Sequence, residues 1–252
     1  MRFFVGLHVP SHCRHFNGCF VSVNRLRNRR AFEVGDWILD SGAFTEVARY
    51  GGYRYSVEEY GGQINRWAAN GNLLAAVSQD FMCEPFVLNK TGKTISEHQQ
   101  MTIERYDKLL PLSNSTYVMP VLQGYPIESY TEHIKMYADR LVTGAWVGVG
   151  SICKRNSNVS AIEDILQAIK SERPDLRLHG FGLKITALQS PLVRQLLHTA
   201  DSMAWSASAR WEGRGRDAND WHEAKSFVDR IEAICSSDER TSTLGASGSI
   251  AD

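Results

Sequence analysis

The chain lacks several features that mark specialised classes of protein. No apolar stretch approaches the roughly 20 residues that cross a bilayer, and the opening MRFFVGLHVPSHC becomes polar too soon for a secretory signal peptide. No Cys-x-x-Cys pair occurs, and the cysteines are odd in number, which disfavours a disulfide framework: Cys13, Cys19, Cys83, Cys153 and Cys235. We therefore expect a protein of the reducing cytoplasm that does not enter a membrane.

The chain also lacks an excess of either charge. It carries 28 basic and 28 acidic residues, so no overall field attracts nucleic acid and any polyanion must be held by a local patch. Apolar residues make up 43% and charged residues 22%, as in globular domains. At 252 residues one barrel-sized domain is expected. We assign it residues 1–235 and expect the Ser, Thr and Gly-rich segment 236–252 to be disordered.

Short apolar runs alternate with segments of helical character along the chain. Near-continuous hydrophobicity predicts parallel strands buried on both faces at residues 3–9, 37–41, 73–80, 116–124, 145–151, 176–183 and 202–208. Capping-box pairs open two of the helices between them, Ser56 with Glu59 and Thr94 with Glu97. The alternation predicts an α/β fold, either an irregular TIM (β/α)8-type barrel in a single domain or an open doubly wound sheet. Seven strands are visible, and CFVSVN (19–24) is the candidate for an eighth.

Polar residues and glycines gather where these runs end. In a barrel the carboxyl ends of the strands meet at one mouth, where such enzymes carry their chemistry, and these positions would converge there: His8, Asp40, Asp80, Gln123, Gly148, Gly150, Gly180 and Gly182. Each also has an ordinary structural explanation. The aspartates could form turns or cap helices, the glycines could serve tight turns, and the histidines could be satisfied polar groups of the core.

Together these residues fit one kind of chemistry. Carboxylates, an amide and bare glycine backbone can bind a flat heterocycle that carries N–H and carbonyl groups. Paired carboxylates also serve glycosidic bonds, because one can attack the anomeric carbon while the other moves a proton. Exchange of a base on a sugar needs both functions.

Six short motifs in order carry a family resemblance: DSGAF (40–44), SQDFMCEP (78–85), PVLQGY (120–125), VGVGS (147–151), LHGFGLK (178–184) and DSMAW (201–205). From His8 to Trp221 the chain resembles the tRNA-guanine transglycosylase superfamily of TIM barrels. It is most similar to the DpdA-type proteins of phages and bacterial genomic islands, which put 7-deazaguanine derivatives into DNA. The resemblance implies a glycosyltransferase of bacteria or phage-infected cells, with DNA and a free base as substrates, no cofactor, and a homodimer or helper protein as further partners.

The same resemblance assigns roles residue by residue. It makes Asp40 the acid/base group, Asp80 the recognition group for the heterocycle edge and Gln123 the glutamine of the family's Gln-Gly pair. Phe44 and Phe181 would sandwich the base, as aromatic faces do with unstacked bases. The full set of implied substrate contacts is Ser41, Gly42, Phe44, Asp80, Gln123, Gly124, Gly148, Val149, Gly150, His179, Gly180 and Phe181.

The nucleophile is implied to be an aspartate of the last strand, and Asp201 is the candidate there. With the last strand assigned to residues 202–208, however, Asp201 precedes the strand instead of ending it. The alternative from the residues alone is that Asp201 starts the strand and Asp40 is the nucleophile.

The sequence also bears on metal binding and on contacts with the DNA backbone. The resemblance implies a cysteine-rich zinc site after the last strand, which the tRNA enzymes and many DpdA-type proteins carry. Residues 209–227 here contain no cysteine and only His222, so four zinc ligands cannot be assembled there and we expect no metal. Arginines in two segments are expected to contact the DNA backbone: Arg25, Arg27, Arg29, Arg30, Arg210, Arg214 and Arg216. Alternatively, each segment is an ordinary solvated loop.

Three rival functions stay open at this point. The first is exchange on tRNA, against which the absent zinc site weighs. The second is a catalytically silent barrel that only binds nucleic acid or a protein. The third is a metal-dependent hydrolase, for which His8, His179 and Asp201 are few ligands.

Overall fold

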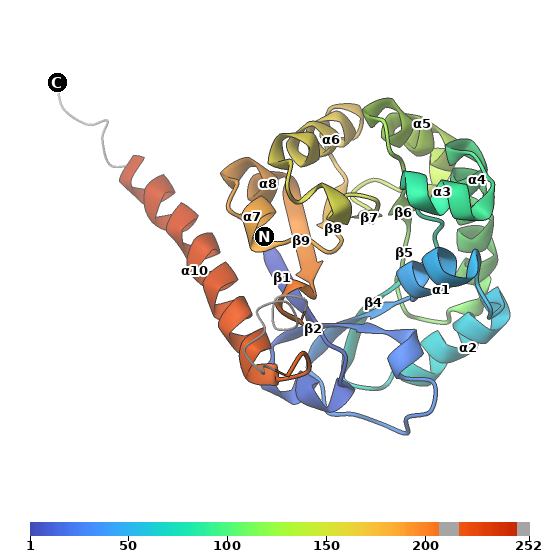
Figure 1. Ribbon diagram of the computed structural model, residues 1–252, viewed down its shortest axis with the longest axis horizontal. Helices are drawn as coiled ribbons and strands as arrows, with labels where there is room; N and C mark the ends of the chain where they lie inside the picture. Colours follow the sequence, from blue (N-terminus) through green and yellow to red (C-terminus); the bar gives the residue numbers. More distant parts are fainter. Residues whose placement is uncertain (207–216, 246–252) are drawn as a thin grey trace.

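The computed structural model describes residues 1–206 and 217–245, and its core is a single ring of parallel strands (Figure 1). In spatial order the strands are β5-β4-β3-β2-β1-β9-β8-β7-β6, and every pairing is parallel. The strands are β1 (Arg2–Gly6), β2 (Gly18–Ser22), β3 (Asp36–Asp40), β4 (Asn72–Val77), β5 (Val118–Met119), β6 (Val121–Leu122), β7 (Trp146–Val149), β8 (Arg177–Gly180) and β9 (Leu197–Ser202).

The ring closes through Pro120, which separates β5 from β6. Proline has no N–H to give to a ladder, so it interrupts a strand inside a sheet. β5 pairs with β4 and β6 pairs with β7, while the Pro120 carbonyl still accepts from Gly148 N at 2.9 Å. The two short pieces thus act as one strand, and the eight-stranded TIM-type barrel is confirmed.

The eighth strand is β2, as the CFVSVN segment suggested. Its burial alternates, because Cys19 and Val21 are fully buried whereas Phe20 and Ser22 are partly exposed. Short 3-10 helices flank it, η1 (Pro10–His15) and η2 (Val23–Arg25), where a regular barrel has α-helices. The barrel is irregular at these first two crossovers.

The last strand differs from the expected one. β9 spans Leu197–Ser202, and residues 204–206 are already helical, with Ala204 N donating to Ser202 Oγ at 3.1 Å. The expected strand at residues 202–208 was wrong for residues 203–206. The apolar Trp205 is buried by a different interaction, in which its indole N–H donates to the Gly6 carbonyl at 2.9 Å. Residues 207 and 208 lie outside the described part. Asp201 therefore lies inside the strand, next to its carboxyl end.

Helices surround the ring on the outside (Figure 1). The capping boxes predicted for α2 and α4 are both present, with Ser56 and Thr94 accepting from the N–H of Glu59 and Glu97. The helices are α1 (Ala43–Tyr50), α2 (Val57–Trp67), α3 (Pro85–Thr91), α4 (Ile95–Leu109), α5 (Ile127–Tyr137), α6 (Val159–Glu172), α7 (Ile185–Leu188), α8 (Pro191–Leu196) and α10 (Trp221–Gly245), with 3-10 turns η3 (Leu110–Leu112), η4 (Ala138–Arg140) and η5 (Cys153–Arg155).

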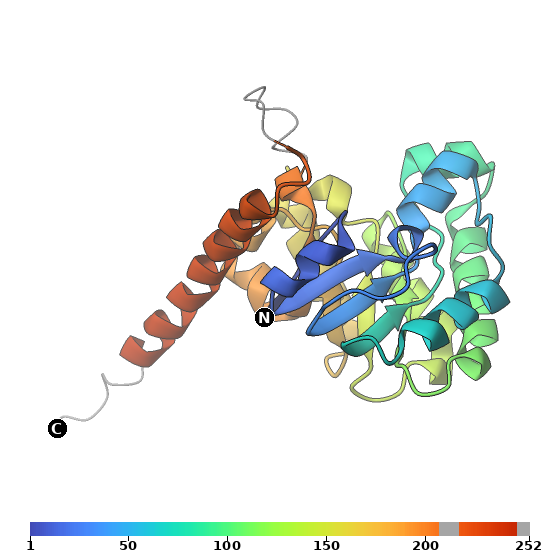
Figure 2. The ribbon, with the colours of Figure 1, turned by 90° about the horizontal axis from the view of Figure 1, so that it is seen from below.

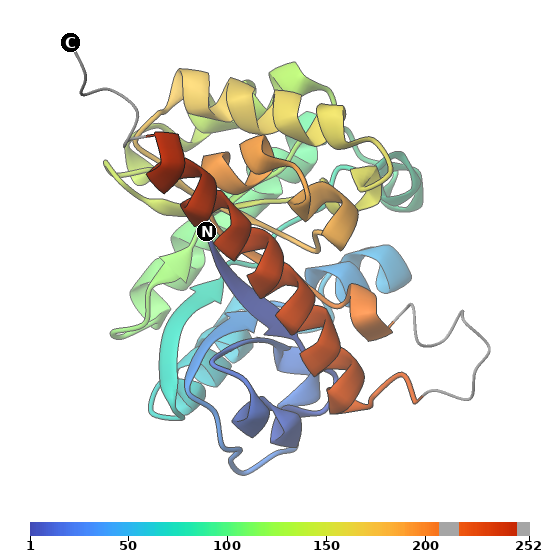
Figure 3. The ribbon, with the colours of Figure 1, turned by 90° about the vertical axis from the view of Figure 1, so that its left-hand side faces the viewer.

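Helix α10 crosses the outside of the barrel beside β1 (Figures 2 and 3). Phe227 packs against Phe3 with ring centroids 6.1 Å apart. The helix runs on to Gly245, into the segment 236–252 that we expected to be disordered, because a helix already nucleated by packing can extend through residues of low propensity. Residues 246–252 lie outside the described part, and the domain boundary at 235 stays a prediction. In the described part of the chain, no helix has the length and apolarity that a membrane span requires.

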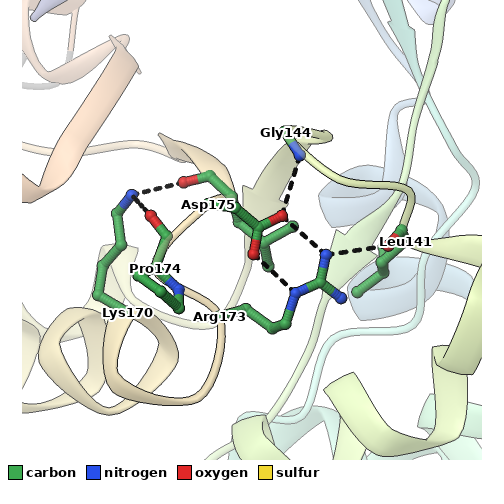
Figure 4. A network of polar contacts seen from close by, with 7 residues as sticks. Leu141, Gly144, Lys170, Arg173, Pro174 and Asp175 are labelled. Atoms are coloured by element: carbon green, nitrogen blue, oxygen red, sulfur yellow. Dashed lines mark hydrogen bonds and ion pairs between the residues drawn. The ribbon is translucent and has the colours of Figure 1, made fainter.

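Polar contacts fasten the amino-terminal ends of β7 and β8 (Figure 4). The Arg173 guanidinium binds both oxygens of Asp175, at 2.8 Å each, and also donates to the Leu141 carbonyl at 3.0 Å. Asp175 accepts from Gly144 N at 2.9 Å, and these bonds lower the pKa of its carboxyl. This end of a barrel serves stability, which leaves the opposite end for chemistry.

Candidate active site

A cavity of about 600 Å³ opens at the carboxyl ends of the strands, a size suited to a small heterocycle with part of its sugar. Strands and loops far apart in the sequence contribute to its wall. Eight of the residues predicted as catalytic or substrate-binding line it: Asp40, Gly42, Phe44, Asp80, Gln123, Gly150, Phe181 and Asp201.

Asp40 ends β3, directly across from Ser22 in the register of β2. Its carboxylate accepts from the Ser22 hydroxyl and from the backbone N–H of Ser41 and Gly42, yet burial and the nearby charge of Asp201 raise its pKa to about 6. Gly42 makes this turn possible, because its φ is +79° and a Cβ there would lie 2.5 Å from Asn24 Nδ2. A carboxyl with this pKa can both accept and return a proton near neutral pH.

Asp80 follows β4 and is only 5% exposed. Burial, with the charge of Asp40, raises its pKa to about 7, against the hydrogen bond that Gln123 Nε2 donates to it. Tyr53 holds the backbone at this point by donating its hydroxyl to the Asp80 carbonyl at 2.9 Å. A second carboxyl thus faces the cavity in an environment that disfavours its charge.

Replacing Asp80 with Asn should change the pH dependence of stability. A carboxyl whose pKa rises on folding stabilises the folded protein fully below its unfolded pKa, and this contribution is lost as pH rises through about 7. Relative to wild type, the Asn variant should therefore gain up to about 4 kcal/mol of unfolding free energy between about pH 4 and pH 8. Urea unfolding at both pH values measures it, and parallel pH profiles would contradict the raised pKa.

Asp201 is held by a chain of hydrogen bonds behind the cavity wall. Trp146 Nε1 donates to Thr199 Oγ1 at 2.8 Å, and the same oxygen lies 2.8 Å from His179 Nδ1. If the Thr199 hydroxyl donates to Nδ1, the ring carries its proton on Nε2, which lies 3.3 Å from Asp201 Oδ1. Gly182 N donates to the same oxygen at 3.1 Å. Two donors thus fix the orientation of the carboxylate.

This arrangement changes the interpretation of His179. Its side chain is fully buried and is not in the cavity wall, where we expected a substrate contact. It stacks on Phe20 with centroids 5.6 Å apart and planes at 15°. His179 therefore lies behind Asp201, with Nε2 3.3 Å from Asp201 Oδ1, and its contact with a substrate stays a prediction.

Sequence reasoning missed Ser151 and Glu84, which meet Gln123 in the wall. Ser151 Oγ lies 2.7 Å from Gln123 Oε1 and 2.9 Å from Glu84 Oε2, and it accepts from Cys83 N at 2.9 Å. Ser151 has a φ of +56°, a left-handed conformation uncommon outside glycine. Ser151 lies in the motif VGVGS and Glu84 in the motif SQDFMCEP. Their place in these motifs could have marked them as site residues, but nothing in the sequence indicates that the two side chains meet.

The other predicted contacts shape the cavity from behind. None of them is in its lining: Ser41, Gly124, Gly148, Val149 and Gly180. A Cβ at Gly148 would lie 2.4 Å from the ring of Phe181, and one at Gly124 would lie 2.5 Å from Ser129 Oγ. Ser41 Oγ lies 3.5 Å from the Tyr53 hydroxyl. Their contact with a substrate stays a prediction.

Aromatic rings lie at two depths of the cavity. Phe181 faces Phe20, with centroids 6.0 Å apart, whereas Phe44 is 51% exposed at the rim. Lys154 Nζ stands 5.2 Å from the centre of the Phe44 ring and 6.0 Å from that of Phe86. The sandwich of Phe44 and Phe181 stays a prediction, and Phe20 is a ring that the sequence did not single out.

Four arginines surround the opening of the cavity: Arg25, Arg27, Arg49 and Arg54. Only the first two were expected. The Arg27 guanidinium lies 3.2 Å from the centre of the Tyr55 ring, and Arg54 pairs with the buried carboxylate of Glu46 at 2.8 Å. Arg29 and Arg30 are not in the lining, and Arg210, Arg214 and Arg216 lie outside the described residues.

No cluster of three or more His, Cys, Asp or Glu side chains suited to a metal ion is found within residues 1–206 and 217–245. His222 Nδ1 lies 2.7 Å from Asp220 Oδ1, and its ring stacks on Trp221. His8 Nδ1 lies 3.1 Å from a guanidinium nitrogen of Arg25. The expectation that this chain holds no zinc stays a prediction.

Comparison with known proteins connects this geometry to a family. The model of the family described as DpdA, DeoxyPurine in DNA protein A, matches residues 1–221. This range includes every described residue of the cavity wall. No curated protein matches the chain.

Proposed function

We propose that this chain, which belongs to the DpdA family, replaces guanine in DNA with a 7-deazaguanine derivative such as 7-cyano-7-deazaguanine. Membership of the family supports a DNA transglycosylase in general terms. The observation that carries the finer proposal is the convergence of Asp40, Asp80, Gln123 and Asp201 on one cavity at the carboxyl ends of the strands.

The exchange would proceed by two displacements at C1′ of the target deoxyribose. Asp201 attacks C1′, the C1′–N9 bond breaks with its electrons going to guanine, and Asp40 supplies the proton that guanine takes up. A glycosyl ester on Asp201 results. The incoming base then gives its N9 proton to Asp40, attacks C1′ and displaces Asp201. Two inversions give net retention, and Asp40 ends in its starting state.

Recognition of the heterocycle would fall to Asp80 and Gln123. A carboxylate accepts hydrogen bonds only, so Asp80 suits the N–H groups of a guanine-like edge. Gly150 leaves room for the Gln123 amide, since a Cβ there would lie 2.1 Å from Gln123 Nε2. The same edge is present on guanine and on its 7-deaza derivatives, which lets one site serve both displacements.

The target base must leave the DNA stack to enter the cavity, and the arginines at the opening would hold the neighbouring phosphates. Arg25 is exposed there. Replacing Arg25 with Ala should weaken DNA binding about equally for all sequences and reduce the salt dependence of log Kd by about one counterion. Titration at several salt concentrations measures this slope.

Arg30→Ala is the matched control for that titration, because Arg30 is exposed in the same basic segment but does not line the cavity. Its salt slope should stay close to that of the wild type. Equal loss in both variants would contradict a specific role for the opening.

The proposed reaction is tested by incubating the protein with guanine-labelled double-stranded DNA and 7-cyano-7-deazaguanine. Release of label together with a deazaguanine nucleoside in the digested DNA is the expected result. Release from tRNA but not from DNA would transfer the activity to tRNA. Release from neither polymer would reject the exchange reaction for the isolated chain.

A further inference from the structure

Glu84 is a buried carboxyl with no role in the scheme above. It is 2% exposed and lies in the wall between the cavity and a side recess formed with Phe44, Pro85, Phe86, Tyr125 and Lys154. It occupies the N-cap position of α3, yet its side chain does not cap that helix. Its Oε2 points to Ser151 Oγ instead, at 2.9 Å.

The hydrogens around Ser151 can be counted. Its Oγ accepts from Cys83 N at 2.9 Å and lies close to two further oxygens, Gln123 Oε1 at 2.7 Å and Glu84 Oε2 at 2.9 Å. A hydroxyl has one proton, so it can donate to only one of them. Two oxygens at such a distance need a proton between them. The second contact must therefore take its proton from the partner.

The orientation of the Gln123 amide shows which of the two contacts receives the Ser151 proton. Its Nε2 donates to Asp80 Oδ2, which turns Oε1 toward Ser151. An amide oxygen carries no proton, so the Ser151 hydroxyl donates to Gln123. The remaining proton, between Ser151 and Glu84, belongs to Glu84 Oε2.

The other oxygen of Glu84 supports the same assignment. Oε1 is buried and has no hydrogen-bond partner among the described residues. A buried charged carboxylate with an unpaired oxygen is costly, whereas the carbonyl oxygen of a neutral acid is much less so. Burial also raises the pKa of Glu84 above its ordinary value. Its own backbone N–H, the contact with Ser151 and the charges of Lys154 and Arg155 act in the opposite direction.

We propose that Glu84 is a neutral carboxylic acid and the positioning residue of the base-recognition site. Its proton orients the Ser151 hydroxyl, Ser151 orients the Gln123 amide, and Gln123 leaves Asp80 as the acceptor for the heterocycle. The expected effect on KM rests on the proposed base exchange, whereas the assignment of the proton to Glu84 does not.

Loss of the Glu84 proton would reverse the hydrogen bond between Glu84 and Ser151. Ser151 would then donate to Glu84, and Gln123 Oε1 would face an oxygen without a proton. The amide would lose its orientation and the base would bind more weakly. The ionisable groups whose charges act on Glu84, or on which its charge acts, are Asp80, Cys83, Tyr130, Cys153, Lys154 and Arg155.

The location of the proton can be read by infrared spectroscopy, without any activity. At about pH 8, above the raised pKa values of Asp40 and Asp80 of about 6 and about 7, the wild type should show the C=O band of a protonated carboxyl. The band should persist in Asp80→Asn and disappear in Glu84→Gln. A band lost in Asp80→Asn but kept in Glu84→Gln would place the proton on Asp80 with Gln123 reversed, and would overturn the proposal. So would a wild type without the band.

Kinetics supply a second test. Glu84→Gln keeps a neutral N–H donor for Ser151 and should retain a KM for the incoming base close to that of the wild type. Glu84→Met has similar length without a donor, and should raise this KM roughly tenfold with a smaller change in kcat. The rise of KM at alkaline pH should be present in the wild type and absent in Glu84→Gln.

Equal damage from Gln and Met would overturn the positioning role, provided that both variants melt like the wild type. If the wild type exchanges no base, the proposed function fails while the infrared result still decides the location of the proton. The two failures are therefore distinguishable.

Discussion

Asp201→Asn is expected to abolish guanine release, lowering exchange by about 10⁴-fold or more. Asparagine has the size of aspartate, and its Oδ1 can keep the bonds from Gly182 N, at 3.1 Å, and from His179 Nε2, at 3.3 Å. The fold should therefore survive. An amide cannot attack C1′ to form the glycosyl ester, so the first displacement stops.

The measurement that identifies the nucleophile is a denaturant-stable adduct between protein and DNA. In the absence of an incoming base, the wild type should accumulate this adduct and Asp201→Asn should not. Adduct formation by Asp201→Asn together with its loss in Asp40→Asn would assign the nucleophile to Asp40. Unchanged guanine release in Asp201→Asn would remove Asp201 from the chemistry altogether.

A matched control separates nucleophilic attack from the positioning of Asp201. Thr199 supports His179 from behind, with its Oγ1 2.8 Å from Nδ1, and is itself buried. Thr199→Val keeps the shape of the side chain but removes the hydroxyl. It should reduce exchange partially, because the ring loses the partner that orients it, while the adduct still forms.

The strand ends were predictable from the sequence because hydrophobic runs end where the barrel opens. Asp40 and Asp80 follow runs that are buried on both faces, and the structure places them together in the cavity. β2 was harder to recognise, since Phe20 and Ser22 face the cavity and only Cys19 and Val21 face the packed side. A half-buried strand of this length carries too few residues for a clear pattern.

The end of the chain shows why apolar residues alone can mislead. Trp205 is apolar enough to suggest that the strand continues, but it is buried outside the strand, where its indole N–H donates to the Gly6 carbonyl. Strand pairing instead uses the less apolar residues from Leu197 to Ser202. Only the register, which places Asp201 opposite Phe4 of β1, shows that this carboxylate belongs to the strand end.

The contacts among Glu84, Ser151 and Gln123 were out of reach for a different reason. The three residues follow three different strands, and their meeting depends on the left-handed backbone of Ser151. Neither propensity nor periodicity encodes such a geometry. Likewise, nothing in the motif LHGFGLK says whether His179 faces the cavity or lies behind Asp201, because residues on one strand alternate between its two faces.

The other large effect is expected from Asp40→Asn, which should lower kcat/KM by about 10²- to 10⁴-fold. Asn cannot give a proton to the leaving guanine or take one from the incoming base, so both displacements slow. Asp36→Asn is the control, since Asp36 starts the same strand and pairs with Arg2 at 2.6 Å, far from the cavity. It should leave exchange unchanged.

The pH profile tests the role of Asp40 more specifically than the rate alone. Because burial and Asp201 raise its pKa to about 6, Asp40 is mostly ionised at neutral pH and becomes protonated as pH falls through that value. Wild-type kcat/KM for DNA should therefore fall as pH rises above about 6, because a growing share of the free enzyme lacks the proton that Asp40 gives to the leaving guanine. This limb should be missing from the residual activity of Asp40→Asn and retained in Asp36→Asn. An unchanged alkaline limb in Asp40→Asn would contradict the assignment of this limb to Asp40.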